Sequence, residues 1–225
     1  MSPLAALAFW AAAFVGTHLL MSHPLRAPLV GRLGERGFSL LYIAVSLGTF
    51  AMMVRSAGAA GPQTPLWQAS LPLWVLASIA MWFGAILFVG SLRRNPAFPT
   101  GGKPVTHIGE ARGVYAITRH PMMWGFALWA MVHIAVWPTG SGLIIATAIL
   151  ILALAGSAGQ DAKKEKLIGE PWTEWKRRTS FLPFGRGAGR PDRFAFAGGT
   201  ILFVLATWGH GALGTMAAGP WRWLV

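Results

Sequence analysis

Four histidines stand in or beside long apolar stretches of the sequence. They are His18, His120, His133 and His210. Ionisable side chains inside a bilayer are costly, so each of them is a candidate functional residue. The chain contains no cysteine, which excludes a catalytic thiol, an iron–sulfur cluster and thiolate-bound zinc, and leaves histidine as the natural ligand for a heme iron. For each histidine alone, a hydrogen bond between helices is the competing interpretation.

A second candidate site surrounds the turn Thr118-Arg119-His120-Pro121. Pro121 suits the first position of a helix, which needs no N–H partner. The free N–H groups of a first helical turn bind anions, and Arg112 and Arg119 would add positive charge beside them. The sequence therefore predicts a site for a cofactor carboxylate or phosphate, with a capped helix and interfacial arginines as the alternative.

Residues 160–193 form a basic, amphipathic segment. Gly169 ends one helix and Pro171 begins a second, short one. Ile168, Trp172 and Trp175 follow an i, i+4, i+7 spacing, which is typical of a helix lying in the membrane interface. The carboxylates of this segment can pair with arginines or accept hydrogen bonds from a cofactor. They are Glu165, Glu170 and Glu174.

The composition describes the environment of these residues. Of 225 residues, 54% are hydrophobic and only 12% are charged, against about 25% charged residues in soluble domains. The mean hydropathy is +0.52. These values exclude intrinsic disorder, a nucleic-acid-binding module and an ordinary cytosolic enzyme. The net charge of +12 is better explained by basic loops at one membrane face than by nucleic acid as a partner.

Five stretches without Asp, Glu, Lys or Arg predict the membrane helices. They are residues 3–21, 38–54, 66–92, 120–160 and 194–221. A membrane helix needs about 20 residues, so the fourth stretch is too long for one span. It contains the turn signal Pro138-Thr139-Gly140-Ser141 and is predicted to form a hairpin of Pro121–Trp137 and Gly142–Gly159. We therefore expect an all-α, polytopic bundle of about six transmembrane helices, forming a single membrane domain over residues 1–225.

The basic residues predict the orientation of this bundle. The loops after the first, third and fifth spans carry 17 of the 19 Lys and Arg residues, and the other face carries only Arg55 and Arg222. Cytoplasmic loops are enriched in Lys and Arg. Both termini are therefore expected outside the cytoplasm.

The depths of the histidines predict which of them can meet. With a rise of 1.5 Å per residue, His18 lies about 5 Å, His133 about 18 Å and His210 about 24 Å from the cytoplasmic ends of their helices. His120 lies at the surface. Untilted helices would pair His18 with His120, or His133 with His210.

Four segments resemble the NnrU family of bacterial membrane proteins. They are Phe14–Leu20, Ser22–Arg26, Ile117–Gly125 and Leu128–His133. The resemblance implies a location in the bacterial inner membrane and an association with denitrification. In that membrane, the orientation predicted from the basic loops puts both termini in the periplasm. The family is similar to zeta-carotene isomerase of plants and cyanobacteria, which binds heme b and isomerises a cis double bond when the iron is reduced.

The resemblance also implies particular site residues. The proposed axial histidines of the isomerase fall on His18 and His133, which become candidate heme ligands, with His120, Arg119 and Arg112 as further cofactor-binding candidates. A cysteine three positions before the second ligand is Ala130 here. Any ligand switch that uses this cysteine is therefore absent.

A wider resemblance reaches the isoprenylcysteine carboxyl and phospholipid methyltransferases. The shared features are Arg-His-Pro before a helix and a charged, aromatic tail that ends in Pro, here residues 165–183. In those enzymes the two segments hold S-adenosylmethionine. Met123 and the Glu170-Pro171 pair depart from their pattern.

Three functions remain open from the sequence. The chain is a heme b protein with a redox-dependent isomerase-like or sensing role, an S-adenosylmethionine-dependent methyltransferase of a lipophilic substrate, or a non-enzymatic accessory protein. Histidines at membrane depth favour the first. The lipid bilayer and a lipophilic small molecule are the expected partners, while the substrate and the oligomeric state do not follow from the sequence.

Overall fold

The computed structural model describes residues 1–98, 104–213 and 216–224. These residues form seven α-helices and two short 3-10 helices, and no strand occurs among them. The α-helices are α1 (Pro3–Ser22), α2 (Arg26–Ala59), α3 (Leu71–Gly90), α4 (Pro121–Val136), α5 (Gly140–Ile168), α6 (Glu170–Arg178) and α7 (Arg193–Ala212). The 3-10 helices are η1 (Gly113–Ala116) and η2 (Gly219–Trp223). The predicted all-α membrane bundle is confirmed.

Five helices, α1, α2, α3, α5 and α7, are long and apolar enough to cross a membrane. The sixth expected span is α4, which has only 16 residues. It ends just before Pro138, and the hydroxyl oxygen of Thr139 then accepts a hydrogen bond from the Gly142 N–H and caps α5. The predicted hairpin is therefore present, with its turn at the predicted residues.

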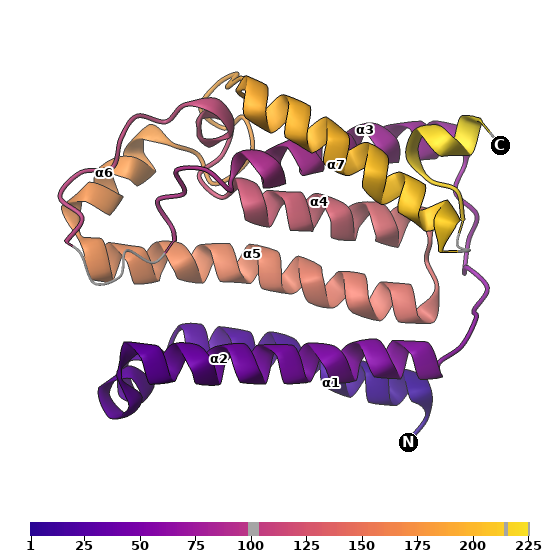
Figure 1. The fold of residues 1–225 in the computed structure, drawn as a ribbon, viewed down its shortest axis with the longest axis horizontal. Helices are drawn as coiled ribbons and strands as arrows, with labels where there is room; N and C mark the ends of the chain where they lie inside the picture. Colours follow the sequence, from indigo (N-terminus) through magenta and orange to yellow (C-terminus); the bar gives the residue numbers. More distant parts are fainter. Residues whose placement is uncertain (99–103, 214–215, 225) are drawn as a thin grey trace.

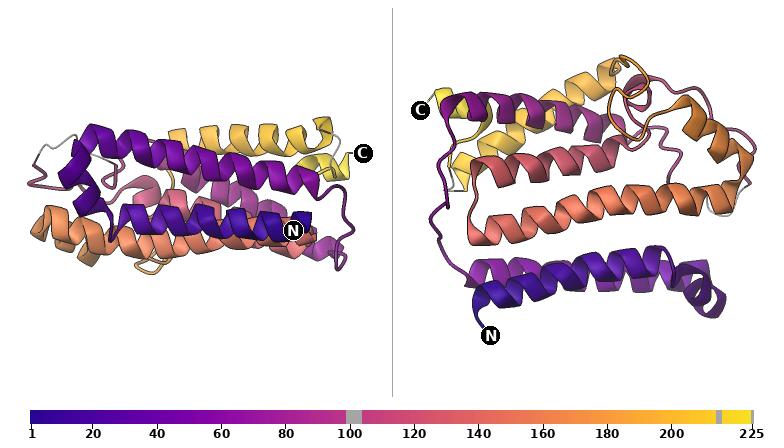
Figure 2. Two further views of the ribbon diagram at one scale, coloured as in Figure 1. Left: turned by 90° about the horizontal axis from the view of Figure 1, so that it is seen from below. Right: turned by 180° about the vertical axis from the view of Figure 1, so that it is seen from behind.

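The helices run side by side along the long axis of the molecule (Figure 1). The α1–α2 hairpin packs through α1 against α5, and α5 packs against α4. On the other side, α3 packs against both α4 and α7. Both termini lie at one end, here called the terminal end, and α6 lies at the opposite end, here called the basic end (Figures 1 and 2).

Glycines let α3 approach its two neighbours at backbone distance. A Cβ atom added to Gly199 of α7 would lie 2.5 Å from the Cα atom of Ile86 in α3. One added to Gly125 of α4 would lie 2.9 Å from the carbonyl oxygen of Gly84 in α3. Small residues are a common means of close helix packing in membranes. Here they make α3 the shared support of α4 and α7.

The short helix α6 packs against protein through the stripe that the sequence analysis assigned to the membrane interface. Trp172 and Trp175 are 0% and 2% exposed and lie in a core with Val114, Tyr115 and Ile117. The apolar stripe was correctly recognised, but its two indoles contact the chain itself rather than lipid. Segment 160–193 is thus part of the folded basic end.

Candidate functional site

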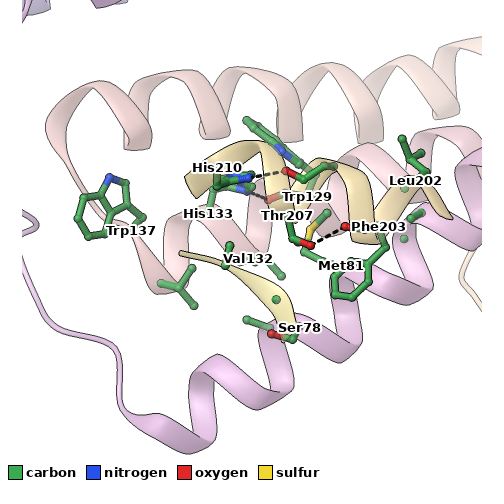
Figure 3. Close-up of a pocket in the computed structure, with 18 of the residues that line it drawn as sticks. Ser78, Met81, Trp129, Val132, His133, Trp137, Leu202, Phe203, Thr207 and His210 are labelled. Carbon is green, nitrogen blue, oxygen red and sulfur yellow. Dashed lines mark hydrogen bonds between the residues drawn. The ribbon is translucent and has the colours of Figure 1, made fainter. Parts of the chain in front are cut away.

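A cleft of about 420 Å³ lies between α4 and α7, with α3 as its floor (Figure 3). Its volume falls in the range of small-molecule sites, about 300–1,000 Å³. The floor consists of buried or small residues of α3, including Trp74, Ala77 and Gly84. At the terminal end, Ala218 and Gly219 complete the lining. The cleft follows from the packing described above, because α4 and α7 both rest on α3 and enclose the space above it.

His133 and His210 face each other across this cleft. Their ring centroids are 6.2 Å apart, with 33° between the ring planes (Figure 3). Among the described residues that line the cleft, they are the only ones with an ionisable side chain. The structure thus brings together one of the two pairs that the depth estimate predicts.

Both imidazoles are oriented by their own helices. The Nδ1 atom of His133 lies 2.7 Å from the carbonyl oxygen of Trp129, and that of His210 lies 2.8 Å from the carbonyl oxygen of Ala206. A carbonyl oxygen only accepts hydrogen bonds, so each Nδ1 carries the proton. In the neutral imidazole the lone pair then lies on Nε2, the tautomer that suits metal binding through Nε2. The Trp129 ring also stacks on His133, with centroids 4.1 Å apart.

The remaining lining of the cleft is apolar. The hydroxyl of Ser78 donates to the carbonyl oxygen of Trp74 at 2.9 Å, and that of Thr207 donates to the carbonyl oxygen of Phe203 at 2.7 Å. Both hydroxyls therefore satisfy their hydrogen bonds within their own helices. What remains is a hydrocarbon and aromatic surface with two imidazoles.

His18 lies in a different part of the bundle. It belongs to α1. The centroid of its ring lies 4.2 Å from that of Phe14 and 5.4 Å from that of Tyr42 in α2. Its Nδ1 atom also lies 2.7 Å from a backbone carbonyl oxygen, that of Phe14. Because α5 lies between the α1–α2 hairpin and α4 (Figures 1 and 2), the structure does not bring His18 and His133 together. This intrahelical bond recurs at His18, His133 and His210 and does not distinguish a ligand.

At the basic end, Arg119 and His120 converge on a carboxylate that the sequence analysis did not single out. Arg119 donates from Nε to Oδ2 of Asp161 at 2.8 Å, and Nε2 of His120 lies 3.0 Å from Oδ1. All three side chains are almost fully buried. The signal for Asp161 is its place as the first charged residue after the long uncharged stretch. This cluster joins the start of α4 to α5.

The predicted anion site is therefore balanced by the chain's own carboxylates. Asp161 neutralises Arg119, and the exposed Arg112 pairs with Glu110 at 2.6 Å. The structure does not bring the two arginines to a common anion. One buried polar atom here, Nδ1 of His120, has no hydrogen-bond partner among the described residues. Anion binding by Arg112 and Arg119 remains a prediction.

The glutamates of the amphipathic segment pair with basic residues, one of the two roles expected for them. Glu165 contacts Lys176 at 2.9 Å, and Glu170 contacts Arg177 at 3.1 Å. Glu174 contacts Arg178. These pairs tie α6 to itself and to the end of α5.

Comparison with known proteins finds relatives of this chain in plants. The chain is 28% identical to the chloroplastic 15-cis-zeta-carotene isomerase of Arabidopsis thaliana over 161 residues, which cover 68% of this chain and 42% of that protein. It is 33% identical to the enzyme of the same name from Zea mays over 84 residues, which cover 36% and 22%. The chain thus spans less than half the length of these relatives. No solved structure matches the chain.

A family model covers almost the whole chain, including α3, α4 and α7. The model is described as NnrU protein and matches residues 6–218. It therefore includes both imidazoles of the cleft and the buried cluster at the basic end. This multi-pass helical membrane protein belongs to the NnrU family.

Proposed function

We propose that this protein is a membrane isomerase that acts on a lipophilic substrate in the cleft between α4 and α7. The observation that carries the proposal is the pair of facing imidazoles, 6.2 Å apart, in an otherwise apolar cleft. The relatives named 15-cis-zeta-carotene isomerase indicate the reaction class, cis–trans isomerisation of a double bond. Such a reaction moves no atoms between molecules, which agrees with a lining that offers few polar groups.

We propose heme b as the cofactor, which His133 and His210 would hold. The supporting observation is that the two imidazole rings lie 6.2 Å apart, centre to centre, and imidazole is a common ligand of heme iron. A bound heme would supply an iron centre whose oxidation state can change. In this reading, His18 is a packing residue of the α1–α2 hairpin, contrary to what the family resemblance implies.

The chain's own residues contribute orientation and the exclusion of water. The carbonyl oxygens of Trp129 and Ala206 accept hydrogen bonds from the two Nδ1 atoms and so fix the orientation of both rings. The stacked Trp129 ring limits rotation of His133. The apolar walls keep water from a bound double bond and lower the local dielectric.

The proposal also includes the location of the protein. Five apolar helices, both termini at one end and the basic loops at the other support a bacterial inner-membrane protein with periplasmic termini, by the positive-inside rule. The association with denitrification remains an expectation from the family resemblance. A redox-dependent isomerase in that membrane would respond to the redox conditions that accompany denitrification.

The absorption spectrum of the detergent-purified protein, oxidised and reduced, tests the cofactor. Heme bound by two histidines gives a low-spin spectrum with sharp bands on reduction. His133→Ala and His210→Ala should each lose heme or become high-spin, whereas His18→Ala, the matched control, should keep the wild-type spectrum. Loss of heme in His18→Ala with an unchanged His210→Ala spectrum would restore the pair implied by the resemblance.

A second assay tests the reaction itself. Protein reconstituted in vesicles with cis-zeta-carotene should yield the trans isomer when a reductant is present and not in its absence, with the isomers separated by chromatography. A heme-loaded protein without any turnover points to a sensing or accessory role. A colourless protein that binds S-adenosylmethionine would instead establish the methyltransferase alternative.

A further inference from the structure

The cleft is open on the side that faces lipid. Phe126 of α4 and Leu202 of α7 both line it, and 40% and 37% of their surfaces are exposed. Both helices run along the bundle, and α7 is long and apolar enough to span the membrane. The surface between the two helices therefore faces acyl chains, and its rim is apolar.

The short helix η2 contacts both α3 and α7 at the terminal end of the cleft. The Trp221 indole N–H donates to the carbonyl oxygen of Val204 in α7 at 3.1 Å. Arg222 stacks its guanidinium over the Trp74 ring of α3, 4.2 Å from the ring centroid. Gly219 is buried against Thr207, so closely that a Cβ atom there would lie 2.7 Å from the Thr207 methyl group. Three contacts thus attach η2 to both α3 and α7 across the end of the cleft.

The lack of charged side chains in the described lining restricts which molecules can enter the cleft. No Lys, Arg, Asp or Glu occurs among the described residues that line the cleft. A charged or zwitterionic headgroup would lose its hydration there without compensation, which is costly, and the two carboxylates of a bound heme would have to lie outside this lining. Aromatic rings on the walls, including Trp129, Phe126 and Phe203, favour contact with planar unsaturated hydrocarbon.

Resting on the proposed function, we infer that the substrate enters and leaves the cleft sideways from the bilayer, between Phe126 and Leu202. The terminal end is the competing route, because Trp137 and Met216 also line the cleft there and are 36% and 37% exposed. On the sideways route the substrate never crosses water, and its working concentration is its concentration in the membrane.

Site-directed spin labelling tests this route, because the chain has no cysteine and any single cysteine is unique. A nitroxide label attached to Leu202→Cys reports on the space between Phe126 and Leu202, here called the mouth of the cleft. Leu205→Cys is the matched control, on the same helix and exposed but outside the cleft lining. In vesicles, both labels should be accessible to oxygen and inaccessible to a charged nickel chelate.

Diphenylhexatriene, an apolar polyene, is then added to the vesicles. It should reduce the mobility of the label at residue 202 and leave the label at residue 205 unchanged. Strong collision of the nickel chelate with the label at residue 202, or equal effects of the polyene at both positions, would overturn the inference. Because the readout needs neither heme nor turnover, a colourless, inactive protein that still shows the selective effect would refute the proposed function alone.

A blocking variant provides the second measurement. Leu202→Trp should narrow the mouth and slow turnover of a membrane-dissolved substrate, while the heme spectrum stays unchanged. Leu205→Trp should have neither effect. Equal rates for the two variants would also contradict lateral entry.

Discussion

Replacing Gly199 with alanine tests the packing that creates the cleft. The added Cβ atom would lie 2.5 Å from the Ile86 Cα atom and 2.7 Å from the Ile86 backbone nitrogen. Ordinary contacts of a Cβ begin at 3.4 Å, so α7 must move away from α3 by about 0.9 Å, the difference between those distances. Because the obstacle is backbone, the cost lies at the upper end of overpacking, about 3 kcal/mol.

Alanine also favours a helix over glycine by about 1 kcal/mol, which leaves a net loss of about 2 kcal/mol. For a chain of this size, such a loss lowers the thermal midpoint by about 4–8 °C. The assay is thermal unfolding of the detergent-solubilised protein. Gly48→Ala is the control, because Gly48 lies within α2 with no atom near its added Cβ, and its midpoint should stay the same or rise. Equal midpoints for the two variants would refute the close α3–α7 packing.

Three further predictions concern the basic end and the orientation. Asp161→Ala leaves its buried partners uncompensated and should cost about 3–5 kcal/mol, measured by thermal unfolding, whereas Glu110→Ala at an exposed pair should cost at most about 1 kcal/mol. Burial, and then the nearby charge of Lys163, lower the pKa of His23 below its ordinary 6.5. The unfolded chain therefore takes up this proton first, so stability falls as the pH drops below 6.5, and His23→Asn should flatten that part of the midpoint–pH curve. A reporter fused after Arg55 should report the periplasmic side, and a cytoplasmic signal there would contradict the proposed orientation.

The sequence predicts the helices well because their signals are local. Uncharged stretches mark the spans, and the Pro138-Thr139 turn marks the break between α4 and α5. Gly169, with a φ of 72°, ends α5 at the predicted place. Helix length and direction predict that His133 and His210 lie at similar depth, and they meet because α4 and α7 both pack against α3.

Side-chain partners were harder to predict because they depend on which helices are neighbours. The spacing of Trp172 and Trp175 establishes an apolar face, but lipid and protein are equally apolar partners for it, and only the fold puts that face against Ile117. In the same way, nothing local links Asp161 to Arg119, 42 residues away in the sequence. The neighbours of His18 are likewise set by the pairing of α1 with α2.

The buried cluster at the basic end and the cleft nearer the terminal end lie in different parts of the bundle. The buried Arg119–Asp161 pair fixes the basic end of α4 against α5, while α4 and α7 are held to α3 by glycine contacts and by η2 at the terminal end. Between these attachments, Phe126 and Leu202 line the cleft and are exposed at the surface of the bundle. Under the proposed function, an apolar cleft suits a reaction whose substrate and product are isomers dissolved in the same bilayer, since neither needs a separate exit.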